Sequence, residues 1–264
     1  MVKYLNAKCY KAFRRKYFYL FLAAILALAG AFMLLLRVEG MHQSQTGDGM
    51  IIIQRVSVPE LLGVLAMALS VGLYFCLIAA DMVFSEQYKY NTLKNEVSFG
   101  LPRLRIYLGK LLSSVLVAVV MCAVLVGGYL LLAFALFPTG ADRLGESLRT
   151  FGLCLAAAFP LWLGGLGFFT MLQFLLRGST AATVVYVMVI GLLGGGFLSL
   201  MSMFIPALEP LEKLMTTISL NTPFNLMRTQ SPESLMGYAW ALGLGWLAVS
   251  TLVGLVGFRK KEIN

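Results

Sequence analysis

Charge is scarce in this sequence, and long apolar runs take its place. Only 12% of the 264 residues are charged, against roughly 25% in soluble domains, and 59% are hydrophobic. About 20 apolar residues cross the hydrocarbon of a bilayer, and several runs reach that length. This composition excludes an ordinary soluble domain and predicts a single all-α polytopic membrane domain over residues 1–264.

Groups that carry enzyme chemistry are also few. The one histidine, His42, falls in an expected outer loop and is read as a surface residue. No G-x-S-x-G, H-E-x-x-H or closely spaced cysteine pair is present, so we expect neither catalytic residues nor a metal site. The four cysteines lie at the inner face or inside apolar runs, which predicts reduced, packed thiols rather than disulfides. They are Cys9, Cys76, Cys122 and Cys154.

A nucleotide-binding loop is absent as well. The P-loop pattern G-x-x-x-x-G-K-[ST] does not occur, and the nearest fragment, Gly109-Lys110-Leu111, lacks both the loop and the hydroxyl. The chain is therefore predicted not to be an enzyme that hydrolyses ATP in the P-loop manner, and no cofactor is expected in it. Charges are also missing from the middle of the apolar runs, which weakens an ion-relay or secondary-transporter interpretation.

The apolar runs predict six transmembrane helices. Their ranges are about 17–36, 59–80, 108–137, 148–176, 180–204 and 235–258. The first run is too long for the apolar core of a signal peptide and lacks a cleavage site, so it is read as an uncleaved span. Ser57 and Glu60 have capping-box spacing, which makes Glu60 a helix-start carboxylate rather than a catalytic one. Pro160 can kink the fourth helix.

Basic residues gather at the two chain ends and between spans two and three. Residues 1–16, 81–110, Arg177 and the tail hold fifteen of the 21 lysines and arginines, while alternate loops hold eight of the twelve acids. By the positive-inside rule both termini are cytoplasmic, and the charge indicates topology rather than nucleic-acid binding. Residues 1–16 predict an amphipathic elbow helix on the anionic membrane surface. Its membrane-surface residues are Lys8, Lys11, Arg14, Arg15 and Lys16.

Two further features concern the packing of the last spans. Residues 205–235 are apolar but interrupted by prolines, which predicts short re-entrant helices in the outer leaflet or, equally, an outer amphipathic cap that only packs. Small residues at four-residue spacing permit close helix contact, within the chain in preference to a dimer seam. They are Gly191 and Gly195 in span five and Gly237, Ala241 and Gly245 in span six.

The longest polar interval, residues 81–110, contains the pattern of a short amphipathic helix. Tyr90, Leu93 and Val97 share one face, Gly100 can end the helix, and Pro102 can begin the next. The interval is either a solvated connector or a docking element for a cytoplasmic partner.

Several short motifs follow one another in this interval. They read Phe84-Ser85-Glu86-x-Tyr88-Lys89, Thr92-Leu93-Lys94-Asn95, Ser98-x-Gly100-x-x-Arg103 and Tyr107-x-Gly109-Lys110. They resemble the cytoplasmic loop between spans two and three of ABC-2 type permeases, and the six-span layout agrees over essentially the whole chain. One departure is Asn91, where the family usually has glycine before T-L-K-N.

This resemblance implies a permease subunit of an ATP-driven exporter in the bacterial cytoplasmic membrane. A separate ATP-binding-cassette ATPase would bind ATP and Mg, and a second copy or a paralogous permease would complete the transporter. The cargo would be an amphipathic drug, antimicrobial peptide or lipid-like molecule, as in drug and lantibiotic-immunity exporters. Residues 81–107 would form the coupling loop. Its ATPase-coupling residues would be Glu86, Tyr88, Lys89, Tyr90, Thr92, Leu93, Lys94, Val97 and Arg103.

Two other classes stay open. A membrane-embedded substrate-binding module driven by a partner would also lack a P-loop, but it would hold substrate tightly without ATP. A proton-coupled carrier would respond to a pH gradient and need no ATPase.

Overall fold

The computed structural model describes residues 2–43, 56–84, 96, 98, 100–176, 178–194, 197–205 and 208–260. Over these ranges the chain is helical and contains no strand. The elements are α1 (Val2–Phe13), α2 (Lys16–Gln43), α3 (Val58–Ala68), the 3₁₀ turn η1 (Leu69–Val71), α4 (Gly72–Phe84), α6 (Arg103–Leu136), α7 (Ala141–Leu175), α8 (Ser179–Gly194), α9 (Phe197–Phe204), α10 (Glu209–Ile218), α11 (Thr222–Leu226) and α12 (Pro232–Lys260).

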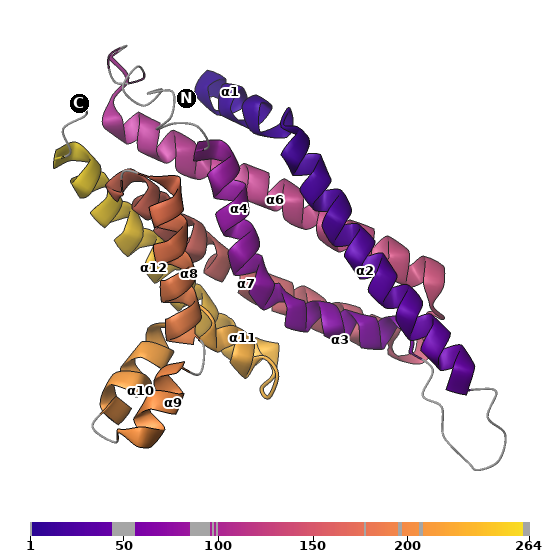
Figure 1. Cartoon of the computed structure of the whole chain (residues 1–264). Coiled ribbons are helices and arrows are strands. Elements are labelled where there is room, and N and C mark those ends of the chain that lie inside the picture. The colour runs from indigo at the N-terminus through magenta and orange to yellow at the C-terminus, as the bar shows by residue number, and fades with distance from the viewer. Residues whose placement is uncertain are drawn as a thin grey trace.

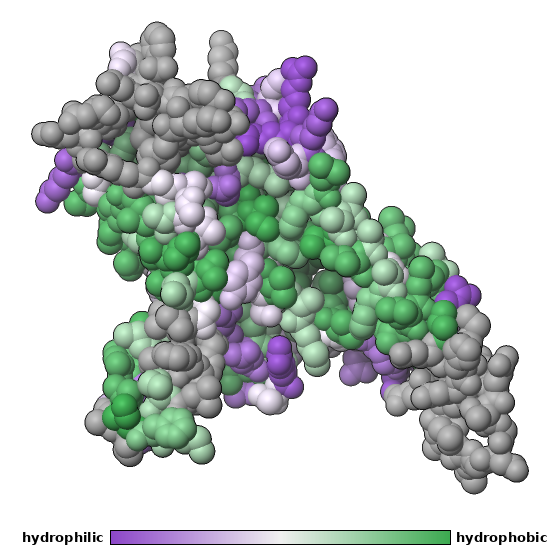
Figure 2. Space-filling model, in the orientation of Figure 1, coloured by the Kyte–Doolittle hydropathy of each residue, from purple (hydrophilic) through white to green (hydrophobic). Residues whose placement is uncertain are grey.

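The long helices form a bundle in which successive elements run in opposite directions (Figure 1). Helix α2, the continuous run α3–η1–α4, and helices α6, α7 and α12 make up most of the bundle. The two chain ends lie at the same end of it, beside α1 and the start of α6. Figure 2 shows that the visible surface along the long helices is largely apolar, while hydrophilic side chains gather toward the ends.

Five described helices are long and apolar enough to cross a membrane. They are Lys16–Val38, Val58–Phe84, Arg103–Leu136, Asp142–Leu175 and Pro232–Lys260. Because about 20 helical residues match the hydrocarbon thickness, these five confirm the prediction of an all-α, multi-pass membrane protein. Helix α8 has 16 residues and falls short of that length, so the sixth span stays a prediction.

The single helix expected over residues 180–204 is two helices in the structure, α8 and α9. The sequence has three consecutive glycines at 194–196, and glycine is among the weakest helix formers. Helix α9 lies beside α10 at the end of the bundle away from the termini (Figure 1). Both helices expose apolar side chains, among them Met203, Phe204 and Leu214.

Residues 205–235 contain two short helices, α10 and α11, before α12 begins at Pro232. The short helices agree with the sequence prediction for this segment, and the last helix begins three residues before the predicted 235. Helix α10 carries Glu209, Glu212 and Lys213 together with the exposed Leu211.

Helices α7 and α12 approach each other backbone to backbone. A Cβ placed on Gly243 would lie 2.2 Å from the backbone oxygen of Pro160, and one on Gly164 would lie 2.8 Å from the oxygen of Gly243. Glycine is therefore required where these backbones meet. Helix α7 continues through Pro160 to Leu175, so the proline does not end it.

Three aromatic side chains bind backbone carbonyls along the α3–η1–α4 run. Tyr129 of α6 donates to the Leu61 oxygen at 3.1 Å, Trp162 of α7 to the Leu69 oxygen at 3.1 Å, and Tyr186 of α8 to the Leu73 oxygen at 2.9 Å. The second acceptor, Leu69, is the first residue of the 3₁₀ turn η1. Three neighbouring helices are thus attached to one interrupted span.

Candidate functional site

A polar cluster centred on Glu96 lies at the end of the bundle that carries both termini. Glu96 belongs to the interval between α4 and α6, and its carboxylate accepts a hydrogen bond of 2.9 Å from the Tyr4 hydroxyl. It also forms ion pairs with Lys8 at 2.5 Å and with Lys110 at 3.4 Å. We call Tyr4, Lys8, Glu96 and Lys110 the Glu96 cluster. It joins α1, the interval and α6 in one contact.

Lys110 is the most deeply placed member of the Glu96 cluster. Its side chain is 0% exposed, and its Nζ lies 5.4 Å from the centre of the Phe84 ring and 5.5 Å from that of Phe174. Among the described residues, the charge partner of this Nζ is the Glu96 carboxylate at 3.4 Å, and the Nζ makes no well-aligned hydrogen bond. A buried cation with one partner depends strongly on that partner.

The electrostatics of the cluster favour an ionised Glu96. Burial by itself raises the pKa of this carboxyl, but the charge of Lys110 and the contacts with Lys8 and Tyr4 together hold the pKa below its ordinary value. Burial, and then the neighbouring negative charge, raise the pKa of the Tyr4 phenol, so the phenol stays protonated and donates to Glu96.

Acidification is expected to loosen this cluster. Because folding lowers the pKa of Glu96 from its ordinary 4.5, the stabilisation is complete above that value and is lost as the pH falls through the folded value. The thermal midpoint of the purified protein should therefore fall as the pH is lowered below 4.5. Glu96→Gln should lack this component of the pH profile. An identical acid-induced drop in that variant would contradict the assignment.

Most of the expected ATPase-coupling residues lie outside the described residues. These are Glu86, Tyr88, Lys89, Tyr90, Thr92, Leu93, Lys94 and Val97. Arg103 is described, at the first turn of α6. Its guanidinium donates to the backbone oxygens of Phe258 at 2.7 Å and Arg259 at 2.6 Å. Arg103 therefore binds the carboxyl end of α12.

The basic arm is a helix, α1, separated from α2 by Arg14 and Arg15. Lys11, Arg14 and Lys16 are exposed, and their contact with a membrane surface stays a prediction. Lys8, predicted to lie among them, turns inward to Glu96 instead, with 18% of its side chain exposed. The amphipathic pattern found the apolar face of this helix but could not show an acidic partner 88 residues away.

The small residues of the last span do not pack as expected. Gly237 and Gly245 have no atom within 4 Å of an added Cβ, and Ala241 is exposed. The prediction that this stripe packs against another helix of the chain is therefore wrong. The close contact with α7 is made by Gly243, on the opposite side of α12. In span five, Gly191 lies against the Tyr74 hydroxyl, whereas Gly195 lies outside the described residues.

A second polar cluster joins α4, α7 and α8. The Asp81 carboxylate accepts a hydrogen bond from the Ser179 hydroxyl and a longer one, 3.4 Å, from the Gln173 amide. Gln173 also donates to Ser179 at 3.0 Å. The structure gives Asp81 a role in holding α8 to the bundle.

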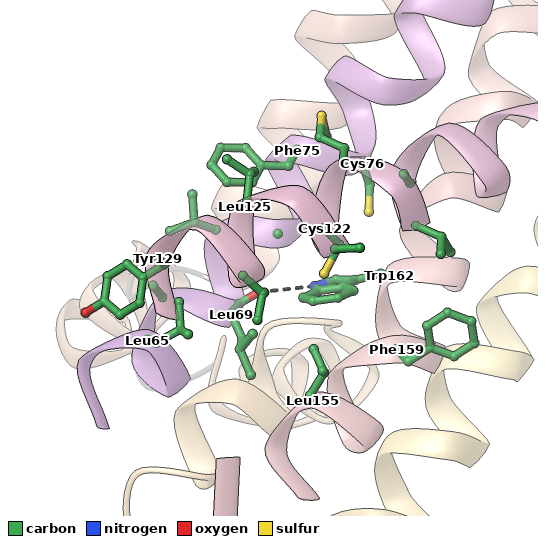
Figure 3. Close-up of a pocket in the computed structure, with 18 of the residues that line it drawn as sticks. Leu65, Leu69, Phe75, Cys76, Cys122, Leu125, Tyr129, Leu155, Phe159 and Trp162 are labelled. Carbon is green, nitrogen blue, oxygen red and sulfur yellow. Dashed lines mark hydrogen bonds between the residues drawn. The ribbon is translucent and has the colours of Figure 1, made fainter. Parts of the chain in front are cut away.

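An apolar cavity of about 670 Å³ lies inside the bundle, among α2, α3, η1, α4, α6 and α7. Figure 3 shows Leu65 and Leu69 on one side, Cys122 and Leu125 of α6 on another, and Phe159 and Trp162 of α7 on a third. The Trp162 indole nitrogen points at the Leu69 oxygen (Figure 3). The hydropathy pattern gave no sign of this cavity, because its lining is indistinguishable in composition from residues that face lipid.

The candidate residues that remain are the histidine and the four cysteines. His42 lies in the last turn of α2 rather than in a loop. The four cysteines are free, as predicted. In the part of the chain that the structure describes, no group of three His, Cys, Asp or Glu side chains could hold a metal ion.

The chain matches no model of a known protein family and no curated protein.

Proposed function

We propose that the chain is the membrane-spanning permease subunit of an ATP-driven exporter. In this proposal a separate ATP-binding-cassette ATPase binds ATP and Mg and docks on residues 81–107, and a second permease copy or paralogue completes the transporter. Both termini face the cytoplasm of a bacterial cell, and the cargo is an amphipathic drug, peptide or lipid-like molecule. The motifs of residues 84–110 are the basis of the family assignment.

The observation that carries the proposal is the position of Glu96. It lies three residues after Leu93, the centre of the expected docking face, and it holds α1 through Lys8 and α6 through Lys110. A partner that displaced residues 81–107 would therefore pull on two helices at once. Such a contact suits a rigid-body coupling between an energy-supplying subunit and the membrane spans.

The path of the chain supports six crossings. Helix α8 leaves the end of α7 beside Asp81 and runs toward the opposite end of the bundle, from which α12 returns (Figure 1). With α8 counted, both termini fall on one side, as the distribution of lysine and arginine requires. The hairpin of α9 and α10 then lies on the other side, where its exposed Met203, Phe204 and Leu214 would enter the outer leaflet as re-entrant helices.

Leu93→Asp is expected to abolish ATP-coupled transport while leaving membrane insertion intact. A charge placed on the apolar docking face would remain desolvated and unpaired against the ATPase. The measurement is co-purification of the chain from its native membrane in mild detergent, followed by an ATPase assay. The wild type should bring down a stoichiometric nucleotide-binding partner, and Leu93→Asp should lose it.

Asn95→Asp is the matched control, because it adds the same charge two residues away, on the other side of the expected helix. That variant should keep its partner. A wild-type chain that purifies without any ATPase would contradict the proposal and favour the carrier or the substrate-binding module. Transport driven by a pH gradient alone would identify the carrier.

A further inference from the structure

We infer that the apolar cavity is a binding site for the hydrocarbon chain of a membrane lipid. The inference concerns binding by this chain alone, and it holds whether or not an ATPase docks on residues 81–107. It rests on the size of the cavity, on the chemistry of its lining and on where it meets the surface.

The cavity is too large to be a packing defect. Protein interiors are close-packed, and voids larger than a water molecule are few. A volume of about 670 Å³ falls instead within the range of ligand pockets, roughly 300–1,000 Å³. Leaving it empty would deprive its lining of dispersion contacts on one side.

Water does not suit the cavity, because the indole and hydroxyl groups of its lining already have partners and its two thiols are weak ones. The Trp162 indole donates to the Leu69 oxygen, and the Tyr129 hydroxyl donates to the Leu61 oxygen. A buried water needs two to four polar partners, which this lining does not offer. A polar headgroup would meet the same obstacle, since burial without hydrogen bonds is costly. The occupant is therefore hydrocarbon.

The membrane supplies that hydrocarbon directly. Every helix that lines the cavity belongs to one of the five membrane-spanning candidates. Three lining residues, Val71, Val119 and Phe159, are 43%, 44% and 38% exposed, so the cavity reaches the outer surface of the bundle. Figure 2 shows a hollow in the apolar surface between α2 and α4. An acyl chain can enter there without crossing water.

Near η1, close packing and a hydrogen bond fix the Trp162 side chain in the wall of the cavity. A Cβ on Gly72 would lie 2.5 Å from the Trp162 ring, so the indole packs directly on the backbone where α4 begins. The hydrogen bond to Leu69 holds the indole at the 3₁₀ turn. On α6, a Cβ on Gly127 would meet no atom within 4 Å, which leaves room for a ligand beside that residue.

Trp162 supplies the probe for a test. In the Trp240→Phe, Trp246→Phe variant it is the only tryptophan of the chain, which has three. This protein is reconstituted into phosphatidylcholine vesicles whose acyl chains carry bromine at mid-chain, where bromine quenches an indole that it touches. We expect strong quenching of Trp162 and no quenching by aqueous acrylamide.

Gly127→Leu should weaken the bromine quenching about threefold, because the new side chain occupies the space that the acyl chain needs. Gly152→Leu is the matched control on an exposed stretch of α7, where an added Cβ also meets nothing within 4 Å. It should leave the quenching unchanged. If Gly127→Leu does not fold, Ala123→Phe fills the cavity from the preceding turn of α6.

Three results would overturn the inference. Quenching by acrylamide would show a cavity filled with water. Absence of bromine quenching in the parent variant would show a cavity that excludes lipid. Equal quenching in the cavity-filling variant and in Gly152→Leu would show that bromine reaches Trp162 from outside the cavity.

Discussion

Replacing Gly243 with alanine is expected to separate α7 from α12 and to lower the stability of the bundle by about 3 kcal/mol or more. The added Cβ would lie 2.2 Å from the Pro160 oxygen and 2.7 Å from the Leu161 nitrogen. Both atoms belong to the backbone, so no change of rotamer can relieve the clash. One of the two helices must move, and the contact between Gly164 and the Gly243 oxygen moves with it.

The free energy of unfolding in mixed micelles of detergent and sodium dodecyl sulfate measures this effect. Gly245→Ala is the control, two residues further along the same helix, where the new methyl group meets nothing within 4 Å. It should be neutral or slightly stabilising, because alanine is a better helix former than glycine. Equal stability of the two variants would contradict the close approach of α7 and α12.

Glu96→Gln is expected to have the second large effect, a loss of up to about 3 kcal/mol when measured at pH 6, because it leaves the charge of Lys110 buried without a carboxylate partner. Lys110 is 0% exposed and is surrounded by the rings of Phe84 and Phe174, so water cannot replace Glu96. The change preserves the shape of the side chain and one acceptor for Tyr4. The loss of stability therefore measures the effect of removing the charge of Glu96 rather than an effect on packing.

A double-mutant cycle separates this effect from a general weakening of the cluster. Lys110→Met removes the buried charge and should cost less than Glu96→Gln. The double variant Glu96→Gln, Lys110→Met should recover stability relative to Glu96→Gln alone, since no unpaired cation remains. The same unfolding measurement serves for all three proteins. Simple additivity of the two single losses would show that Lys110 and Glu96 do not interact.

Features set by neighbours in sequence were predicted well. The capping box is one example, since the Ser57 backbone nitrogen donates to the Glu60 carboxylate as the spacing indicated. Five of the six predicted spans are helices of membrane-spanning length. In each case the information lies within one helical turn or one apolar run, so no distant contact was needed.

Features set by distant contacts were not predicted. The Glu96 cluster joins Tyr4 to a residue 92 positions away, and a single sequence contains no signal for such a pair. The packing face of α12 was misassigned for a related reason. Gly237, Ala241 and Gly245 form one stripe of small residues, while Ala239, Gly243 and Gly254 lie on the buried side. Two faces of similar composition cannot be told apart until the neighbouring helix is in place.

The bonds from Tyr129, Trp162 and Tyr186 to the α3–η1–α4 run have a consequence for motion. Sliding that run by one helical turn would break all three hydrogen bonds. The hydrocarbon of a bilayer offers no other hydrogen-bond partner, so the run and its three neighbouring helices form a unit that resists shear. Among the described residues, no side-chain hydrogen bond attaches α2 to another span. Apolar contacts have no fixed direction and tolerate small rotations. We therefore expect α2 to rock more easily than the spans that such bonds hold, and α2 forms one wall of the cavity.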